Sequence, residues 1–260
     1  MSAIAERIKD DLGYLKLQRA AEVFATAAQD AKAKHMSHLE FLERVVSEEA
    51  AHTRNRRLAA RLRFARFPQR KTLEEFDFSF QPSIDKKLIE DLATLDFVVD
   101  GIPVLLLGQP GTGKSHIAVA LAVKVVEAGY QGYFSSAADM CAAIAASYAL
   151  GSFDHKIRTY TKPTVLVIDD VGLTPFSQAE ANAFFQVVNR RYEIGRSTIV
   201  TTNRGLASWG ELFGDPVVAA AILDRLMHRA VIVNIRGKSF RMREHQALIE
   251  RMNKEVGSTV

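Results

Sequence analysis

Apolar residues in the first quarter of the chain recur at helical spacing. In residues 15–34 they fall three and four positions apart, and most of them are alanine, which has the highest helix propensity. Ser37 followed by Glu40 is a capping-box pattern, which predicts a second helix that continues until Pro68 ends it. We therefore expect residues 1–66 to form a small all-helical N-terminal domain.

After residue 82 the pattern changes to short apolar runs that alternate with helical stretches. Strands that alternate with helices of about 10–15 residues predict right-handed crossovers and a parallel sheet covered by helices on both faces. The expected fold class is α/β, with residues 67–82 as a linker and residues 83–260 as the second domain. The expected strands are Val104–Leu107, Gly132–Ser135, Val165–Asp169, Ser197–Thr202 and Val231–Ile235. The expected helices are Lys114–Ala128, Ala137–Leu150, Gln178–Gly195 and Asp215–His228.

The composition is that of an ordinary globular protein, since hydrophobic residues make up 48% of the 260 residues and charged residues 25%. This balance excludes a collagen-like or wholly disordered chain. The single cysteine, Cys141, cannot form a disulfide within the chain, which is typical of a reducing compartment. The start has no apolar signal region, and no stretch approaches about 18 uncharged apolar residues. We expect a cytoplasmic protein that does not span a membrane.

One segment supplies more than the whole formal net charge of +4. Residues 52–71 contain eight basic side chains and no acidic one, and such a block indicates a polyanionic partner. Binding through phosphate contacts would fall steeply with salt and depend weakly on base sequence. Two alternatives remain: a solvated helix end that pairs with acids of the same protein, and a docking surface for a protein partner. The candidate DNA-binding residues are Arg54, Arg56, Arg57, Arg61, Arg63 and Arg66.

Residues 108–115 match the phosphate-binding pattern G-x-x-x-x-G-K-[ST] between an expected strand and an expected helix, which is the context that the pattern requires. Its glycines allow backbone N–H groups to point at a phosphate, at the positive end of the following helix. Lys114 is expected to reach the β- and γ-phosphates and Ser115 to bind Mg²⁺, so ATP and Mg²⁺ are the expected cofactors. The expected nucleotide contacts are Gly108, Gln109, Pro110, Gly111, Thr112, Gly113, Lys114, Ser115 and His116.

Acidic and polar residues follow two of the buried strands. Asp169 and Asp170 end one strand, where the first carboxylate is expected to hold Mg²⁺ and the second to orient and deprotonate the attacking water. Asn203 ends the next strand and is expected near the γ-phosphate. The simpler alternatives are that Asp170 begins a turn at Gly172 and that Asn203 is an ordinary turn residue. The acidic pair favours hydrolysis over passive binding.

In this order, the motifs resemble the IstB family of AAA+ ATPases, the ATP-dependent helper proteins of insertion-sequence transposition, which are related to DnaC-type helicase loaders. The resemblance covers essentially the whole chain. It is carried by the helical N-terminal region, the aromatic segment 72–82, the P-loop, Asp169-Asp170-Val171-Gly172, Thr202-Asn203, residues 222–226 and residues 235–241.

The resemblance implies an AAA+ oligomer with ATP between subunits. In it, Arg225 would be the arginine finger offered to a neighbour's γ-phosphate, with Arg229 as second choice, and Arg241 would be the sensor-2 arginine that contacts the nucleotide. The fixed charge and fork geometry of a guanidinium suit both roles. Without the resemblance, a solvated or ion-paired arginine is the simpler interpretation of Arg225 and Arg241.

Two features depart from the family pattern. Asp170 stands where AAA+ proteins most often have glutamate, so slow basal turnover is expected. Only 19 residues follow Arg241, which leaves room for about one helix and predicts a reduced or absent lid.

The leading hypothesis is an ATPase that oligomerises with ATP on duplex DNA and delivers target DNA to, or activates, a partner transposase. The main alternative is a DnaC-like helicase loader that acts on single-stranded DNA and a replicative helicase. A third hypothesis is a scaffold that binds ATP and DNA with negligible hydrolysis. A small-molecule kinase is disfavoured because no acceptor pocket is evident after the P-loop.

Overall fold

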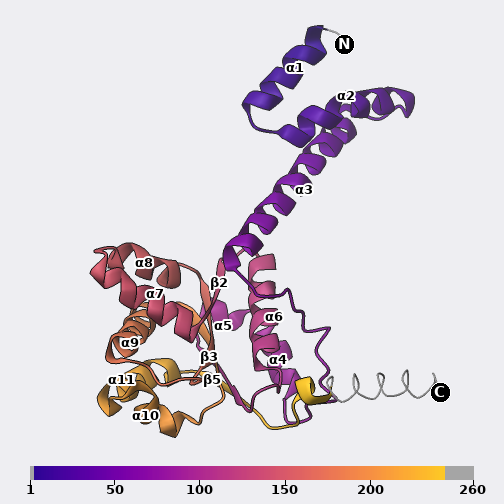
Figure 1. Cartoon of the computed structure of the whole chain (residues 1–260). Helices are drawn as coiled ribbons and strands as arrows, with labels where there is room; N and C mark the ends of the chain where they lie inside the picture. Colours follow the sequence, from indigo (N-terminus) through magenta and orange to yellow (C-terminus); the bar gives the residue numbers. More distant parts are fainter. Residues whose placement is uncertain (1–2, 244–260) are drawn as a thin grey trace, which may run out of the picture. The chain divides into compact units, whose positions relative to one another are not determined.

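The computed structural model describes residues 3–243 and divides the chain into two compact units, Met1–Ala60 and Arg61–Val260 (Figure 1). The first unit contains α1 (Ala3–Tyr14), α2 (Gln18–Ala33) and the larger part of α3 (His38–Ala65). The division at residue 60 falls inside α3. The domain boundaries expected at residues 66 and 82 stay predictions.

The first unit has a small alanine-rich core. Ala20, Phe24 and Ala27 of α2 are buried together with Val45 of α3. Two helices here were expected from the periodic apolar residues, and both are confirmed. Helix α1 is an addition to the predicted elements. Its Ile4 and Ile8 are exposed, whereas its Leu12 packs against the alanine-rich core.

The start of α3 follows the predicted capping box. The backbone N–H of Ser37 donates to a carboxylate oxygen of Glu40 at 2.6 Å, and the Glu40 N–H donates to Ser37 Oγ at 3.3 Å. These two bonds satisfy backbone donors that a helix start leaves without intrahelical partners. The helix therefore begins where the sequence places it.

The second unit is built on a five-stranded sheet of order β2-β3-β4-β1-β5, in which all neighbouring strands are parallel. The α/β fold class is thereby confirmed, and the predicted strand ends differ from the observed ones by at most two residues. The strands are β1 (Val104–Gly108), β2 (Gly132–Ser136), β3 (Val165–Val171), β4 (Ser197–Thr202) and β5 (Val231–Ile235). The helices are α4 (Lys86–Leu92), α5 (Asp96–Val99), α6 (Lys114–Glu127), α7 (Ala137–Ala149), α8 (Phe153–Thr161), α9 (Gln178–Glu193), η1 (Leu206–Ser208), α10 (Trp209–Phe213) and α11 (Pro216–Met227).

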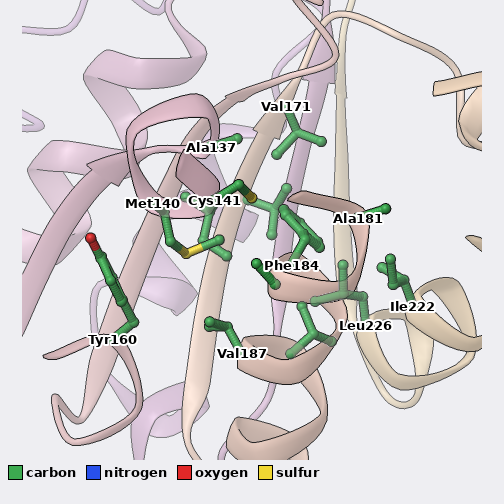
Figure 2. Close-up of a cluster of buried hydrophobic side chains, with 14 of the residues drawn as sticks. Ala137, Met140, Cys141, Tyr160, Val171, Ala181, Phe184, Val187, Ile222 and Leu226 are labelled. Carbon is green, nitrogen blue, oxygen red and sulfur yellow. The ribbon is translucent and has the colours of Figure 1, made fainter. Parts of the chain in front are cut away.

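Helices cover both faces of the sheet, as Figure 1 shows. On one face α7, α9 and α11 pack around Phe184, with Met140 and Leu226 beside it (Figure 2). On the other face α6 contributes Ile117 and Leu121 to a second buried cluster. Strands buried on both sides explain the nearly uninterrupted apolar runs of β1 and β3.

Several short helices are absent from the sequence-based prediction, namely α4, α5, α8 and α10 with η1. Helices of four to nine residues contain too few turns for a clear apolar period.

Two other predictions concern the C-terminal end of the chain and whether it crosses a membrane. The predicted reduction or absence of a lid falls largely on residues 244–260, which lie outside the described residues. Among residues 3–243 no helix is long and apolar enough to cross a membrane.

The buried side chain of Arg191 connects α9 to the start of β4 and to the residues just before β3. The position of Arg191 near the end of α9 predicts only a favourable interaction with the helix dipole. The structure instead buries the side chain, which is 1% exposed. Its guanidinium donates to Thr198 Oγ1 at 2.9 Å and to the carbonyl oxygens of Tyr160, Thr161, Pro163, Thr164 and Ser197. Burial lowers the pKa of Arg191 to about 9, which leaves the group charged at pH 7.

Replacing Arg191 by methionine should strongly destabilise the fold. The change leaves several buried carbonyl groups without donors, so we expect a loss of about 3 kcal/mol and a fall in Tm of roughly 6–12 °C. Arg190→Met is the matched control. The Arg190 side chain is partly exposed, and its Nη1 atom forms only a solvent-exposed ion pair with Asp154 Oδ1 at 3.8 Å. Thermal unfolding should change little in that control. Equal Tm values for the two variants would contradict the structural role of Arg191.

Candidate nucleotide-binding site

The P-loop connects β1 to α6 at the carboxyl end of the sheet. Since β1, β3 and β4 are parallel neighbours, the segments that follow them meet at this edge. A cleft of about 950 Å³ lies here. It is lined by P-loop residues and also by Asp169, Asp170, Asn203, Phe240 and Arg241.

Glycines allow the P-loop to approach its neighbours closely. Gly111 and Gly113 have φ values of +79° and +97°, a region that other residues rarely adopt. A Cβ atom on Gly113 would meet the Phe76 ring at 2.5 Å, and one on Gly111 would overlap Ser239. Two neighbouring segments, residues 76 and 239, therefore pack directly against the phosphate-binding loop.

Lys114 is the cation of this loop. Its side chain is only 5% exposed, and its ammonium group donates to the carbonyl oxygen of Gln109 at 2.9 Å. Burial lowers the pKa of Lys114, while the negative charges of Asp170 and Asp169 act in the opposite direction. A phosphate in the cleft would provide this partly desolvated cation with counter-charge.

The two carboxylates of β3 line the same cleft but differ in environment. Asp169 is 7% exposed, whereas Asp170 is exposed and has a φ of +57°. Partial burial of its carboxyl, followed by the charge of Asp169, raises the pKa of Asp170, while Lys114 and Arg241 counteract the rise. The four charged groups thus lie close enough to influence one another.

Asn203 and Arg241 complete the cleft. The amide oxygen of Asn203 is buried and has no hydrogen-bond partner among the described residues. Arg241 lies within electrostatic range of both Asp170 and Lys114. Most of the residues that the sequence placed on the nucleotide thus line one cleft, whereas Gly108 and Gln109 are not among its lining residues, and the individual roles stay predictions.

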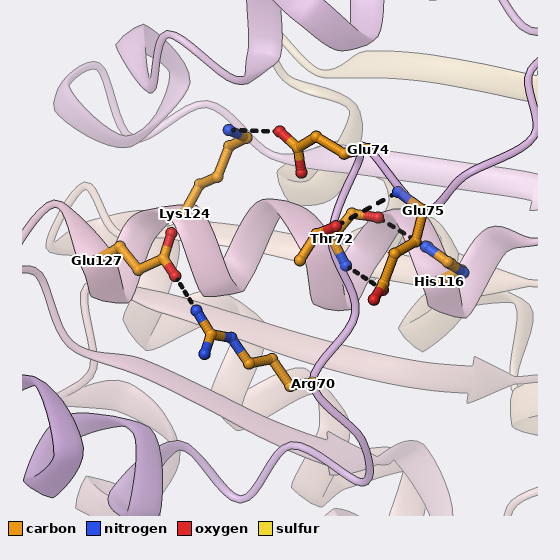
Figure 3. Close-up of polar contacts among 7 residues, drawn as sticks. All are labelled: Arg70, Thr72, Glu74, Glu75, His116, Lys124 and Glu127. Carbon is orange, nitrogen blue, oxygen red and sulfur yellow. Dashed lines mark hydrogen bonds and ion pairs between the residues drawn. The ribbon is translucent and has the colours of Figure 1, made fainter.

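A segment absent from the predicted site closes one wall of the cleft. Residues 70–76 run along α6, held by Arg70 bound to Glu127 at 2.6 Å and by Lys124 near Glu74 at 3.5 Å (Figure 3). His116 donates from Nε2 to the carbonyl oxygen of Thr72 at 2.8 Å. His116 lines the cleft, and this bond directs its ring to the strap formed by residues 70–76. In the sequence, only the aromatic composition of segment 72–82 indicates a role for this strap.

Arg225 lies outside the cleft. It donates to Asn189 Oδ1 and to the Ala221 carbonyl oxygen, and it lies over the Phe185 ring at 5.1 Å. With Arg229 it borders a separate pocket of about 240 Å³. The structure therefore does not bring Arg225 to the nucleotide cleft of its own chain.

The predicted DNA-binding arginines line one stretch of helix and the residue after it. Arg54, Arg56 and Arg57 belong to the first unit and are exposed. Arg61, Arg63 and Arg66 belong to the second unit, where Arg66 lies over the Tyr133 ring at 5.9 Å. Within residues 3–243 none of the six forms an ion pair with an acidic side chain. Of the eight basic residues in the block, Arg70 pairs with Glu127, whereas these six arginines have no acidic partner in the described part of the chain.

The donor set fits a magnesium–nucleotide complex better than a protein-only metal site. Among the described residues no group of three or more His, Cys, Asp or Glu side chains could hold a metal ion. Magnesium at nucleotide sites uses one or two protein ligands together with phosphate oxygens and water. Ser115 and Asp169 both line the cleft and provide such ligands.

Fold and site together define a P-loop nucleotide-binding protein of the AAA+ class. The chain belongs to the family of IstB-like ATP-binding proteins, whose model matches residues 10–247. It is 40% identical over 233 residues to the protein named for ATP binding in insertion sequence IS21 of Pseudomonas aeruginosa, covering 90% of this chain and 88% of the relative. The corresponding IS5376 protein of Geobacillus stearothermophilus is 37% identical over 239 residues, covering 92% of this chain and 95% of the relative.

Solved structures support the fold assignment. A crystal structure of DnaI superposes with a TM-score of 0.56 at 20% identity, covering 64% of this chain and 91% of that one. The DnaC helicase loader superposes with a TM-score of 0.51 at 22% identity, covering 57% of this chain and 86% of that one. At these identities the likeness establishes the shared AAA+ fold alone.

Proposed function

We propose that this protein hydrolyses ATP to ADP and phosphate, assembles on duplex DNA in its ATP-bound state, and delivers target DNA to, or activates, a transposase. The proposal depends most on one observation, which is that the Asp170 carboxylate shares a cleft with Lys114 and Asp169. A site for nucleotide binding alone needs no second carboxylate next to the metal ligand. The names of the relatives, which refer to insertion sequences, favour transposition.

In this proposal each polar group of the cleft has one task. Lys114 and the P-loop N–H groups hold the β- and γ-phosphates, and Ser115 and Asp169 bind Mg²⁺. When bound, Mg²⁺ neutralises charge that develops on the phosphate oxygens. Asp170 orients the attacking water and accepts its proton, for which a raised pKa is favourable. Asn203 hydrogen-bonds the water or the γ-phosphate, and Arg241 contacts the nucleotide.

The position of Arg225 supports the proposed assembly. Its distance from the cleft of its own chain supports a role in trans, with the guanidinium placed on the γ-phosphate of a neighbouring subunit. ATP would then lie between subunits, so that self-association and turnover depend on each other. Arg229 borders the same pocket and is the second choice for this role.

The basic stretch of α3 is proposed to bind DNA through phosphates. Exposed arginines without acidic partners can release counterions from a duplex without reading its bases. The second candidate function is a helicase loader acting on single-stranded DNA and a replicative helicase. It is favoured by the likeness in fold to the DnaC helicase loader.

Asp170→Asn should abolish hydrolysis while ATP binding persists. Removing the proton acceptor is expected to lower kcat by about 10²–10⁴-fold. In the wild type, kcat should fall on acidification at a higher pH than an ordinary aspartate would give, because the pKa of Asp170 is raised and the ionised base is lost below it. The measurement is the pH profile of steady-state turnover with DNA present.

Stability provides the control for this variant. A carboxyl with a raised pKa destabilises the folded state above that pKa, and the penalty disappears as the pH falls through it. Asparagine has no such penalty and tolerates the left-handed backbone of residue 170, so Tm should stay equal or rise slightly. Measurable turnover that is unchanged in Asp170→Asn would contradict the role of Asp170 as the base, whereas negligible turnover in both proteins would favour the scaffold hypothesis.

Arg225→Ala should lose hydrolysis but keep nucleotide binding, and mixing should reveal whether it acts in trans. Lys114→Ala lacks nucleotide binding but retains Arg225. In mixtures of the two variants, an interface between an intact cleft and an intact Arg225 should restore part of the turnover. The readout is ATPase rate against mixing ratio at constant total protein. Absence of recovery at every ratio would contradict the role of Arg225 in trans.

Replacing Arg54, Arg56 and Arg57 by glutamine should weaken DNA binding and reduce its salt dependence. Three lost phosphate contacts should lower the slope of log affinity against log salt by about 2 to 3. Arg7, Lys9 and Lys16, also exposed in the first unit, provide a control with the same change of charge. Equal slopes for the two triple variants would move the DNA surface elsewhere.

The wild-type protein and the two triple variants are compared by sedimentation velocity. Each is mixed with fluorescent duplex or single-stranded DNA, with and without a slowly hydrolysed ATP analogue. A large nucleotide-dependent complex that prefers duplex supports the transposition role. Preference for single strands supports the helicase-loader role.

A further inference from the structure

The pairing of β3 with β4 is interrupted at the two carboxylates. Ile168 pairs with Val200, and the next pair is Val171 with Thr202. Two residues of β3, Asp169 and Asp170, therefore lie opposite one residue of β4, which is Thr201. This is the arrangement of a β-bulge, a feature that often redirects side chains near active sites.

The bulge changes where the second carboxylate points. In a regular strand consecutive side chains point to opposite faces of the sheet. Here Asp169 and Asp170 both line the cleft, and the φ of +57° at Asp170 is the local deviation that accompanies this. A non-glycine residue keeps such a backbone only where its surroundings hold it.

Thr201 supplies bonds to both carboxylate residues. Its hydroxyl donates to Asp169 Oδ1 at 2.6 Å and accepts the backbone N–H of Asp170 at 2.9 Å. The side chain is fully buried, so water does not compete for these bonds. A hydroxyl has one proton to donate, and here the carboxylate of Asp169 receives it.

We propose that Thr201 is a positioning residue of the ATPase site, whose hydroxyl orients the Asp169 carboxylate toward Mg²⁺ and holds the Asp170 peptide in the conformation that turns its carboxylate into the cleft. The inference rests on the proposed function, because it assigns tasks within the same site. Thr201 fixes the Asp169 carboxylate through its Oδ1 atom. Partners of metal ligands commonly control metal affinity in this way.

Neighbouring threonines of β4 differ from Thr201 in what they contact. Thr198 accepts a hydrogen bond from Arg191, and Thr202 donates to the carbonyl oxygen of Val171 at 2.7 Å. Both bonds serve the fold. Among the described residues, Thr201 is the threonine of β4 whose hydroxyl bonds the Asp169 carboxylate and the Asp170 backbone N–H.

The test compares Thr201→Val, which removes the hydroxyl at nearly constant shape, with Thr201→Ser, which keeps it. Binding of a fluorescent ATP analogue is titrated with Mg²⁺, and kcat is measured with DNA. For Thr201→Val we expect the half-saturating Mg²⁺ concentration to rise about 10- to 100-fold and kcat to fall by a similar factor. Thr201→Ser should lie within about threefold of the wild type in both.

Thr198→Val is the matched control, because it also removes a buried hydroxyl from β4. It should lower Tm through Arg191 and leave the Mg²⁺ dependence unchanged. Should Thr201→Val fold poorly, Thr201→Cys retains a weak donor of similar size, and an intermediate shift is expected. A wild-type Mg²⁺ dependence in folded Thr201→Val or Thr201→Cys would overturn the proposal.

The two proposals fail in different ways. If wild type and Asp170→Asn are equally inactive, hydrolysis is refuted, while the Mg²⁺ titration still reports on Thr201. If Asp170→Asn is inactive but Thr201→Val matches the wild type in both kcat and Mg²⁺ dependence, the ATPase function stands and the positioning role of Thr201 is refuted.

Discussion

The parallel pairing of β3, β4 and β1 is the constraint on which the candidate site depends. Parallel strands end at the same edge of a sheet, so residues that are about 100 positions apart in the chain share one cleft. β1 contributes the P-loop, β3 the two carboxylates and β4 Asn203. The segment after β5 adds Arg241.

Several residues at this edge have left-handed backbones, as do others elsewhere in the second unit, such as Leu95 and Arg229. Gly111, Gly113 and Asp170 all have left-handed backbones around the cleft, and β3 carries its bulge there. Such conformations persist only when the surrounding structure fixes them. Clusters buried on both faces of the sheet, together with the hydrogen bonds of Arg191, provide that rigid surrounding. Strain and rigidity thus lie close together, as expected where polar groups must be held in place for chemistry.

Features that depend on local sequence could be predicted, whereas those that depend on tertiary contacts could not. The strands and the P-loop follow from apolar runs and from glycine spacing, and both are confirmed. Arg191 occupies a helix end, so its sequence position suggests a solvated charge, and only the packing of α9 on the sheet buries it. Thr201 belongs to an ordinary β-branched strand sequence. Its hydroxyl contacts the Asp169 carboxylate and the Asp170 backbone N–H because of a bulge that no local pattern indicates. The roles of Arg225 and Arg241 could be predicted only from the resemblance to a family.

Under the proposed function, one chain holds an incomplete hydrolytic site. The cleft contains a cation, the two carboxylates and Asn203, but Arg225 is engaged by Asn189 and Phe185 on another part of the unit. Under this proposal, Arg225 of a neighbouring chain would supply an arginine in addition to Arg241. Asp170 has a shorter side chain than the usual glutamate, so an isolated chain is expected to turn over slowly. Contact between chains would then bring Arg225 to the cleft of its neighbour. Because hydrolysis would need this contact, it would depend on assembly on DNA.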